Sequence, residues 1–218
     1  MNFGQLKMYI DGELVSSVNN VTKEIYSPLN DERIATLSWA DSLDSERALK
    51  SAEQGFDSWS KTTLKKRKEW MLLLRDKILE KEEILRKSIS YEMGKPYGAT
   101  AEDIESITNS LKYYSDIVED YQKDKVIIDP DGTHNHHLVS KPIGVVVAYL
   151  AWNFPLLNAG FKLGPALASG CSIILKPSEL SPISLYIIGE ILHEINFPKG
   201  VVNILCGEPS EVATTLSK

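Results

Sequence analysis

Residues 144–155 read GVVVAYLAWNFP, and residues 172–179 read SIILKPSE. In both segments a continuous apolar run with several β-branched residues is followed directly by a turn that carries polar side chains. Strands that are buried on both faces of a parallel sheet have this kind of run. In open α/β sheets, ligands bind outside the carboxyl ends of such strands. We therefore expect the two turns at one edge of a parallel sheet, around a ligand site.

The polar side chains of these turns are Asn153, Lys176 and Glu179. The Asn153 amide can stabilise an oxyanion on a carbonyl carbon, or it can cap the helix that Pro155 begins. Glu179 can accept hydrogen bonds from the ribose of a dinucleotide, or it can be a capping acid in a surface turn. A Gly-x-Gly-x-x-Gly phosphate loop is absent after these strands, so a bound dinucleotide would have its pyrophosphate held differently.

From residue 144 onward, strand and helix patterns alternate. A third strand is expected at residues 201–205, ended by Gly207. One helix is expected from Pro155 to Gly170, with Gly164-Pro165 kinking or interrupting it; a second follows a Ser181-Pro182 cap, and a third starts near Ser210. This alternation predicts an α/β protein with a partial Rossmann-like parallel sheet.

The first 125 residues predict a hairpin followed by helices. Asp11-Gly12 is a two-residue hairpin signal between strands at residues 7–10 and 13–15, and another strand is expected at residues 33–39. Helical patterns cover residues 44–59 with Asp44 as the cap, residues 63–93 with a break near Glu80 and Gly94 as the C-cap, and residues 99–122.

A second hairpin is predicted where residues 126–128 and 134–140 flank the turn DPDG. The segment contains His134, His136 and His137, but neighbouring residues of a strand point to opposite faces, so only His134 and His136 share one. Zinc sites need three or four ligands, and we predict no metal site. An exposed hairpin with an edge available for pairing with another subunit is favoured.

The composition excludes several classes of function. A net charge of −6 provides no basic excess for binding nucleic acid. Residues 142–161 are uncharged, but the prolines and asparagines among them argue against a membrane span. The N-terminus has no signal-peptide pattern, and the two cysteines, Cys171 and Cys206, form no disulfide framework. The expected location is cytoplasmic.

Seven ordered segments together resemble the aldehyde dehydrogenase superfamily over the whole chain. They are YIDGE (9–13), EMGKP (92–96), KPIGVVV (141–147), WNFP (152–155), KLGPALASG (162–170), KPSE (176–179) and FPKGVVN (197–203). The resemblance implies NAD(P)-dependent oxidation of an aldehyde to a carboxylic acid, by thiolate attack, hydride transfer to a nicotinamide and thioester hydrolysis. It also implies three regions: residues 1–125 as the N-terminal part of the cofactor domain, 126–143 as an oligomerisation hairpin, and 144–218 as the first βαβαβ unit.

The resemblance also implies roles for individual residues. Asn153 would be the oxyanion-hole amide. The residues on the cofactor would be Leu150, Ala151, Trp152 and Asn153 on the nicotinamide side, Lys176, Ser178 and Glu179 at the adenosine ribose, and Gly207 after the third strand. Glu179 favours NAD, and Lys176 leaves NADP as the alternative. A homo-oligomer formed through residues 126–140 and a small-molecule aldehyde substrate are implied.

In this family the catalytic cysteine and the general-base glutamate lie further along the chain than Lys218. Cys171 is expected to be a small buried hydrophobe, and Cys206, which can be exposed after the third strand, lacks a positioned base. We therefore expect an N-terminal part that is inactive alone. We also expect marginal stability, because the sheet has an open edge and the helix at residues 183–195 lacks part of its packing partner.

Two other readings remain open at the level of sequence. The chain can belong to a reductase of acyl phosphates or acyl thioesters with the same architecture, or it can be a non-catalytic assembly module that acts through its hairpin. Architecture alone does not fix the chemistry. The coding sequence beyond Lys218 distinguishes these readings, because a general-base glutamate there favours water-dependent oxidation.

Overall fold

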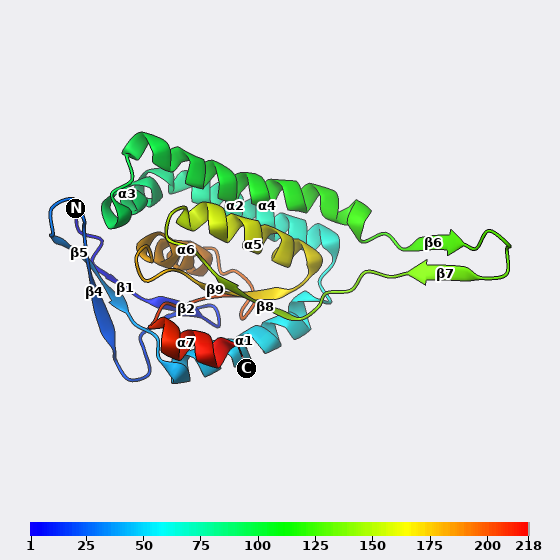
Figure 1. Cartoon of the computed structure of the whole chain (residues 1–218), viewed down its shortest axis with the longest axis horizontal. Helices are drawn as coiled ribbons and strands as arrows, with labels where there is room; N and C mark the ends of the chain where they lie inside the picture. Colours follow the sequence, from blue (N-terminus) through cyan, green and yellow to red (C-terminus); the bar gives the residue numbers. More distant parts are fainter. Residues whose placement is uncertain (218) are drawn as a thin grey trace.

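A five-stranded mixed sheet runs through the centre of the computed structural model, which describes residues 1–217 (Figure 1). Its strands lie in the order β3 (Glu13–Val15), β2 (Met8–Ile10), β10 (Val202–Ile204), β9 (Ser172–Lys176) and β8 (Val145–Tyr149). The strands β8, β9 and β10 are parallel, as the alternating pattern predicted. The α/β class and the partial Rossmann-like sheet are therefore confirmed.

The N-terminal hairpin extends this sheet beyond β10. Asp11 and Gly12 have φ values of 56° and 80°, which suit the tight turn that the Asp-Gly pair predicted. The strand β2 pairs antiparallel with β10, with Ile204 opposite Tyr9. Within residues 1–217, β10 is covered by β2, whereas β8 has no further strand beside it. The parallel part of the sheet therefore has the expected open edge at β8 only.

Helices cover both faces of the sheet (Figure 1). On one face lie α1 (Ser42–Trp59) and α7 (Pro209–Leu216). On the other lie α2 (Leu64–Glu80), α3 (Glu82–Met93), α4 (Ala101–Tyr121), α5 (Pro155–Ser169) and α6 (Ile183–Glu194), with the short 3-10 helix η1 (Tyr97–Thr100) before α4. None of the helices that the structure describes is long and apolar enough to cross a bilayer.

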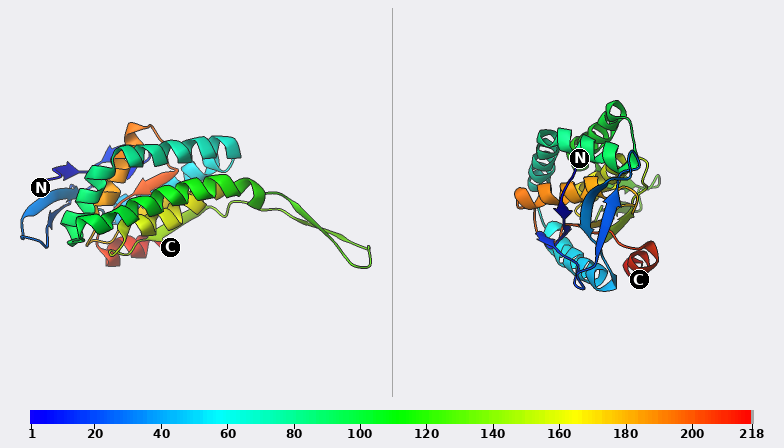
Figure 2. Two further views of the ribbon diagram at one scale, coloured as in Figure 1. Left: turned by 90° about the horizontal axis from the view of Figure 1, so that it is seen from above. Right: turned by 90° about the vertical axis from the view of Figure 1, so that its left-hand side faces the viewer.

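Two structures project from this core at opposite ends (Figure 2). A three-stranded sheet of β1 (Gln5–Leu6), β5 (Arg33–Ser38) and β4 (Thr22–Tyr26) lies at the end near the N-terminus. The predicted second hairpin is present as β6 (Lys125–Ile128) and β7 (Asn135–Leu138), and every residue of both strands is exposed. Because both strands are exposed along their whole length in the described structure, their apolar side chains are available to another surface.

The ends of the first helices follow the sequence signals with one exception. Thr63 caps α2, the helical stretch breaks at Lys81, and Gly94 closes α3 with a φ of 73°. The exception is α1, which is capped by Asp41 and not by Asp44. Asp41 accepts the backbone N–H groups of Leu43 and Asp44, and Asp44 completes the capping box from the third helical position.

The helix α5 continues through Pro165, so the predicted interruption at Gly164-Pro165 is wrong. Close packing on α4 explains why the helix persists. A Cβ added at Gly160 would lie 2.7 Å from the Cα of Ile107, so the two backbones approach as closely as glycine allows. The contact energy along this interface outweighs the one backbone hydrogen bond that proline removes.

The helix α6 differs from the prediction in two ways. Pro182, not Ser181, is the residue before its first turn, and the carboxyl group of Glu92 in α3 accepts the N–H groups of Ile183 at 2.6 Å and Ser184 at 3.3 Å. The expected shortage of packing partners is also wrong, because the apolar side chains of α6 are at most 5% exposed. The N-terminal helices supply the missing partners.

Candidate functional site

The turns after β8 and β9 lie side by side at the carboxyl edge of the sheet. Tyr149 is opposite Lys176 in the parallel register, and the backbone N–H of Leu150 donates to the carbonyl of Lys176 at 3.0 Å. Trp152 and Glu179 line one cavity of about 380 Å³ beside this edge. The structure thus brings the two sequence-predicted turns together.

Asn153 lies in the turn between β8 and α5, and its residue surface is exposed. Its side chain forms no hydrogen bond to residues 1–217, so the alternative reading of Asn153 as a helix cap is wrong. The carboxylate of Asp103 in α4 takes that place and accepts the N–H groups of Leu156 at 3.1 Å and Leu157 at 3.3 Å. The two amide donors of Asn153 therefore have no hydrogen-bond acceptor among residues 1–217.

Lys176 and Glu179 form an ion pair at the end of β9. The Nζ–Oε2 distance is 2.9 Å, with the lysine side chain 6% exposed and the glutamate side chain 38% exposed. Partial burial acts to raise the pKa of Glu179, but the hydrogen bond and charge of Lys176 outweigh it and hold that pKa below its usual value. Glu179 is thus ionised at neutral pH and presents a carboxylate to the edge of the sheet.

The remaining predicted residues are less distinctive. The Ser178 hydroxyl accepts the N–H of Leu180 at 3.2 Å, which shapes the turn. Gly207 has a packing reason to be glycine, because a Cβ there would lie 2.1 Å from the carbonyl oxygen of Ala40. Among the described residues, no three His, Cys, Asp or Glu side chains gather in a way that could hold a metal ion.

Neither cysteine is placed to act as a nucleophile. Cys206 is fully buried, which corrects the expectation that it can be exposed. Burial raises the pKa of its thiol to about 12, and its Sγ lies 3.6 Å from the carbonyl oxygen of Pro177. Cys171 is a buried small hydrophobe, as expected. Any thiolate at this edge of the sheet must therefore come from outside residues 1–217.

Three residues near the site were missed from the sequence. Glu92 and Asp103 cap α6 and α5, and Lys95 pairs with Asp103. Glu92 and Lys95 belong to the segment EMGKP, which was noted only as a family feature. A capping acid from a distant helix leaves no local signal, because the capped helix and the acid are separated by 50 residues or more.

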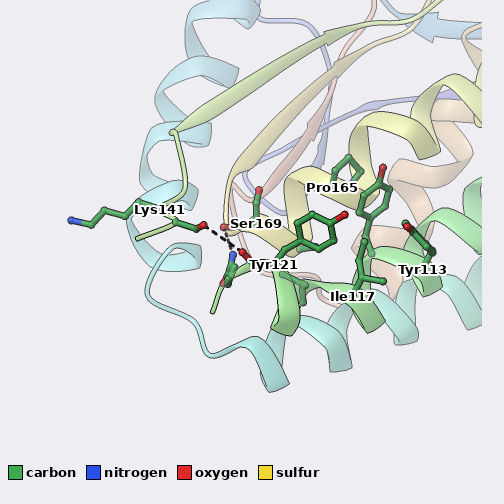
Figure 3. A pocket seen from close by; sticks show the side chains of 11 residues that line it. Tyr113, Ile117, Tyr121, Lys141, Pro165 and Ser169 are labelled. Atoms are coloured by element: carbon green, nitrogen blue, oxygen red, sulfur yellow. Dashed lines mark hydrogen bonds between the residues drawn. The ribbon is translucent and has the colours of Figure 1, made fainter. Parts of the chain in front are cut away.

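An apolar hollow lies away from these turns. It has a volume of about 410 Å³ and lies between α4 and α5 at the base of the hairpin (Figure 3). Tyr113, Ile117 and Tyr121 line it from α4, and Pro165 lines it from α5. None of the predicted catalytic or cofactor residues borders it. We interpret it as part of an apolar surface and not as the catalytic site.

The two turns lie outside the carboxyl ends of neighbouring parallel strands, which is where open α/β sheets bind their ligands. Residues 15–218 match the model of the aldehyde dehydrogenase family. The chain belongs to this family, and the resemblance noted from its motifs is confirmed.

Comparison with individual proteins gives the same result. The chain is 34% identical to aminoaldehyde dehydrogenase 2 of Solanum lycopersicum over 96% of its length, and 33% identical to the chloroplastic betaine aldehyde dehydrogenase of Amaranthus hypochondriacus over 97%. It spans 42% and 44% of these two relatives, respectively.

Two solved structures are similar in fold. The NAD+ complex of betaine aldehyde dehydrogenase from Staphylococcus aureus matches 97% of this chain at 36% identity with a TM-score of 0.90. The 3,6-anhydro-L-galactose dehydrogenase complexed with NADP matches 97% at 30% identity, also with a TM-score of 0.90. The chain covers 42% and 44% of those two proteins.

Proposed function

We propose that this chain takes part in the NAD(P)-dependent oxidation of an aldehyde to a carboxylic acid, contributing the oxyanion donor and part of the cofactor site. The observation that carries the proposal is the Asn153 side chain, which is exposed and has no hydrogen-bond partner within residues 1–217, beside the turn that holds Lys176 and Glu179. Membership of the aldehyde dehydrogenase family supports the same chemistry.

In the proposed reaction the side-chain amide of Asn153 donates a hydrogen bond to the aldehyde oxygen as that oxygen gains negative charge. Asp103 already accepts the N–H groups at the helix start behind it, and the amide has no competing partner among residues 1–217. Donors fixed in advance stabilise such charge without reorganising. The attacking thiolate and the base for thioester hydrolysis come from residues outside the described chain.

The donor set at the sheet edge fits a dinucleotide. The ionised carboxylate of Glu179 is suited to accept the ribose hydroxyls, Ser178 lies in the same turn, and Leu150, Ala151 and Trp152 form the neighbouring turn. A nicotinamide cofactor bound by these residues would supply the hydride acceptor. We propose NAD as the preferred cofactor, because Lys176 is engaged by Glu179 and is not free for a 2′-phosphate. Among the predicted cofactor residues, Gly207 has the least support, because its packing already accounts for the glycine.

Two activity measurements test the proposal. The purified chain, given excess aldehyde with NAD or NADP, is expected to show no turnover, and clear turnover would show that the missing nucleophile is not needed. A chimera that joins this chain to the part of the Staphylococcus aureus betaine aldehyde dehydrogenase beyond the matched region is expected to oxidise betaine aldehyde. A folded chimera without activity would contradict the proposal.

We further propose that the chain consists of three regions, residues 1–125, 126–143 and 144–218. Residues 126–140 of the middle region are proposed to form a contact between copies of the chain. The exposed apolar side chains Val126, Ile127 and Ile128 support this contact, and so does the apolar hollow at the hairpin base. Replacing Ile127 by Glu is expected to shift the mass measured by light scattering toward the monomer. An unchanged mass of an oligomer would exclude this contact.

We also propose a cytoplasmic location. The two cysteines are free and buried, which suits a reducing compartment but does not require one. One relative is described as chloroplastic, so localisation differs among similar proteins. Fluorescence imaging of the tagged natural gene product tests this, and a signal confined to an organelle or the cell exterior would contradict it.

A further inference from the structure

We propose that Asp103 and Lys95 are positioning residues that fix the turn carrying Asn153. This inference rests on the proposed function, because it assigns these residues to the oxyanion donor. It concerns side chains that lie 50 or more residues from Asn153 in the sequence and that reach the turn through the fold.

Asp103 fixes the first turn of α5 from outside that helix. Its side chain is fully buried, and one carboxylate oxygen accepts both the Leu156 and the Leu157 N–H groups. Leu156 lies three positions after Asn153. A change in the orientation of the helix start would therefore move the turn that carries Asn153. A charged acceptor at a helix N-terminus also interacts favourably with the helix dipole.

Lys95 contacts the same turn through its ammonium group. Its ammonium lies 2.6 Å from the second carboxylate oxygen of Asp103 and 3.6 Å from the centroid of the Phe154 ring. Phe154 directly follows Asn153. The backbone of Lys95 is held in turn, because the Ser90 hydroxyl donates to its carbonyl at 2.8 Å. One buried ion pair therefore contacts the residues on the C-terminal side of Asn153 at three points.

The far end of α5 is also anchored, so the helix cannot shift along its axis to compensate. Three side chains donate to carbonyls of its last turn: Trp59 to Leu167 at 3.0 Å, Arg67 to Ala168 at 2.8 Å and Gln122 to Ser169 at 3.1 Å. The turn of Glu179 has a separate support in Glu92 at the start of α6. Loss of Asp103 should therefore move the Asn153 turn and leave the Glu179 turn in place.

A buried ion pair is a poor way to gain stability, since desolvation consumes much of the attraction. Its value here is geometric. A donor displaced by about 1 Å can lose about a hundredfold in rate, so a rigid support of the Asn153 turn has a direct chemical consequence. The pair fixes both the helix start and the aromatic ring that flank the donor.

Nuclear magnetic resonance on the full ¹⁵N-labelled chain tests this without an activity assay. The variants are D103N, K95M and K95R, with D116N as the matched control because Asp116 is an exposed ion-pairing acid on the same helix. The readouts are the side-chain amide signals of Asn153, the exchange rates of the Leu156 and Leu157 amides, and the Leu180 amide as a reference for the turn after β9.

We expect D103N and K95M to shift the Asn153 signals, and D103N to speed exchange at Leu156 and Leu157 by about tenfold or more. K95R, D116N and the Leu180 signal should stay close to the wild type. Unchanged Asn153 signals in D103N and K95M would overturn the proposal, and so would an equal change at Leu180. If D103N does not fold, the Asn153 signals of K95M alone test the proposal. An inactive chimera would refute the proposed function without altering these signals.

Discussion

Replacing Glu92 by Gln is predicted to remove a large pH dependence of stability. The Glu92 residue is 4% exposed and lies at the N-terminus of α6. Burial raises the pKa of its carboxyl from 4.5 to about 8, although the N–H groups of Ile183 and Ser184 act to lower it, and the charge of Asp103 adds to the rise. The side chain is therefore largely protonated in the folded protein at neutral pH.

The sign of the effect follows from the two pKa values. Below about pH 4.5 the group is protonated in both states, and its stabilising contribution is fully present. As the pH rises toward 8, the unfolded chain releases the proton and the folded chain keeps it, so the free energy of unfolding falls. A rise from 4.5 to about 8, at about 1.4 kcal/mol per pKa unit, gives a total loss of about 5 kcal/mol.

Urea unfolding from pH 5 to pH 9 measures this loss in wild type and E92Q, with E119Q on the exposed face of α4 as a control for a general change of charge. The free energy of unfolding of E92Q, relative to that of wild type, should rise by about 1.4 kcal/mol per pH unit between pH 5 and pH 8. Above pH 8 this difference should stay constant. Parallel stability curves for wild type and E92Q would show that Glu92 is not buried in its neutral form.

Three further outcomes follow from the structure. Gly160→Ala should lower the free energy of unfolding by about 1–3 kcal/mol, because its Cβ meets the Ile107 backbone, and an unchanged urea midpoint would contradict this. Cys206 should react with iodoacetamide only after denaturation, as followed by mass spectrometry, and rapid labelling of the native chain would contradict its burial. Asn153→Ala should change stability by no more than about 0.5 kcal/mol in urea unfolding, whereas a larger loss would indicate a structural role.

The features that the sequence predicts well are those with a local physical cause. Asp11-Gly12 forms the hairpin because both residues adopt positive φ, and Gly94 ends α3 for the same reason. The apolar runs of β8 and β9 form the predicted parallel strands, and β9 is buried along its whole length, whereas β8 at the edge of the sheet is half-buried. The meeting of the two turns follows from the parallel pairing of these strands.

The features that the sequence does not predict depend on contacts between distant segments. Ser181 satisfies the rule for a helix cap, but Glu92 from α3 takes the capping position. Pro165 satisfies the rule for a helix break, but the packing of α5 on α4 keeps the helix intact. The start of α5 is of the same kind, since Phe154 precedes the helix and Asp103 from α4 accepts the Leu156 N–H group in place of Asn153.

The most direct test of the account is the turnover number of the chimera with betaine aldehyde and NAD, compared between Asn153 and Asn153→Ala. We predict that the variant retains its affinity for NAD, measured by fluorescence titration, and loses about a hundredfold to a thousandfold in turnover, as expected when one oxyanion donor is removed. An Asn153→Ala chimera that is folded and as fast as its parent would contradict the assignment of Asn153 as the oxyanion donor.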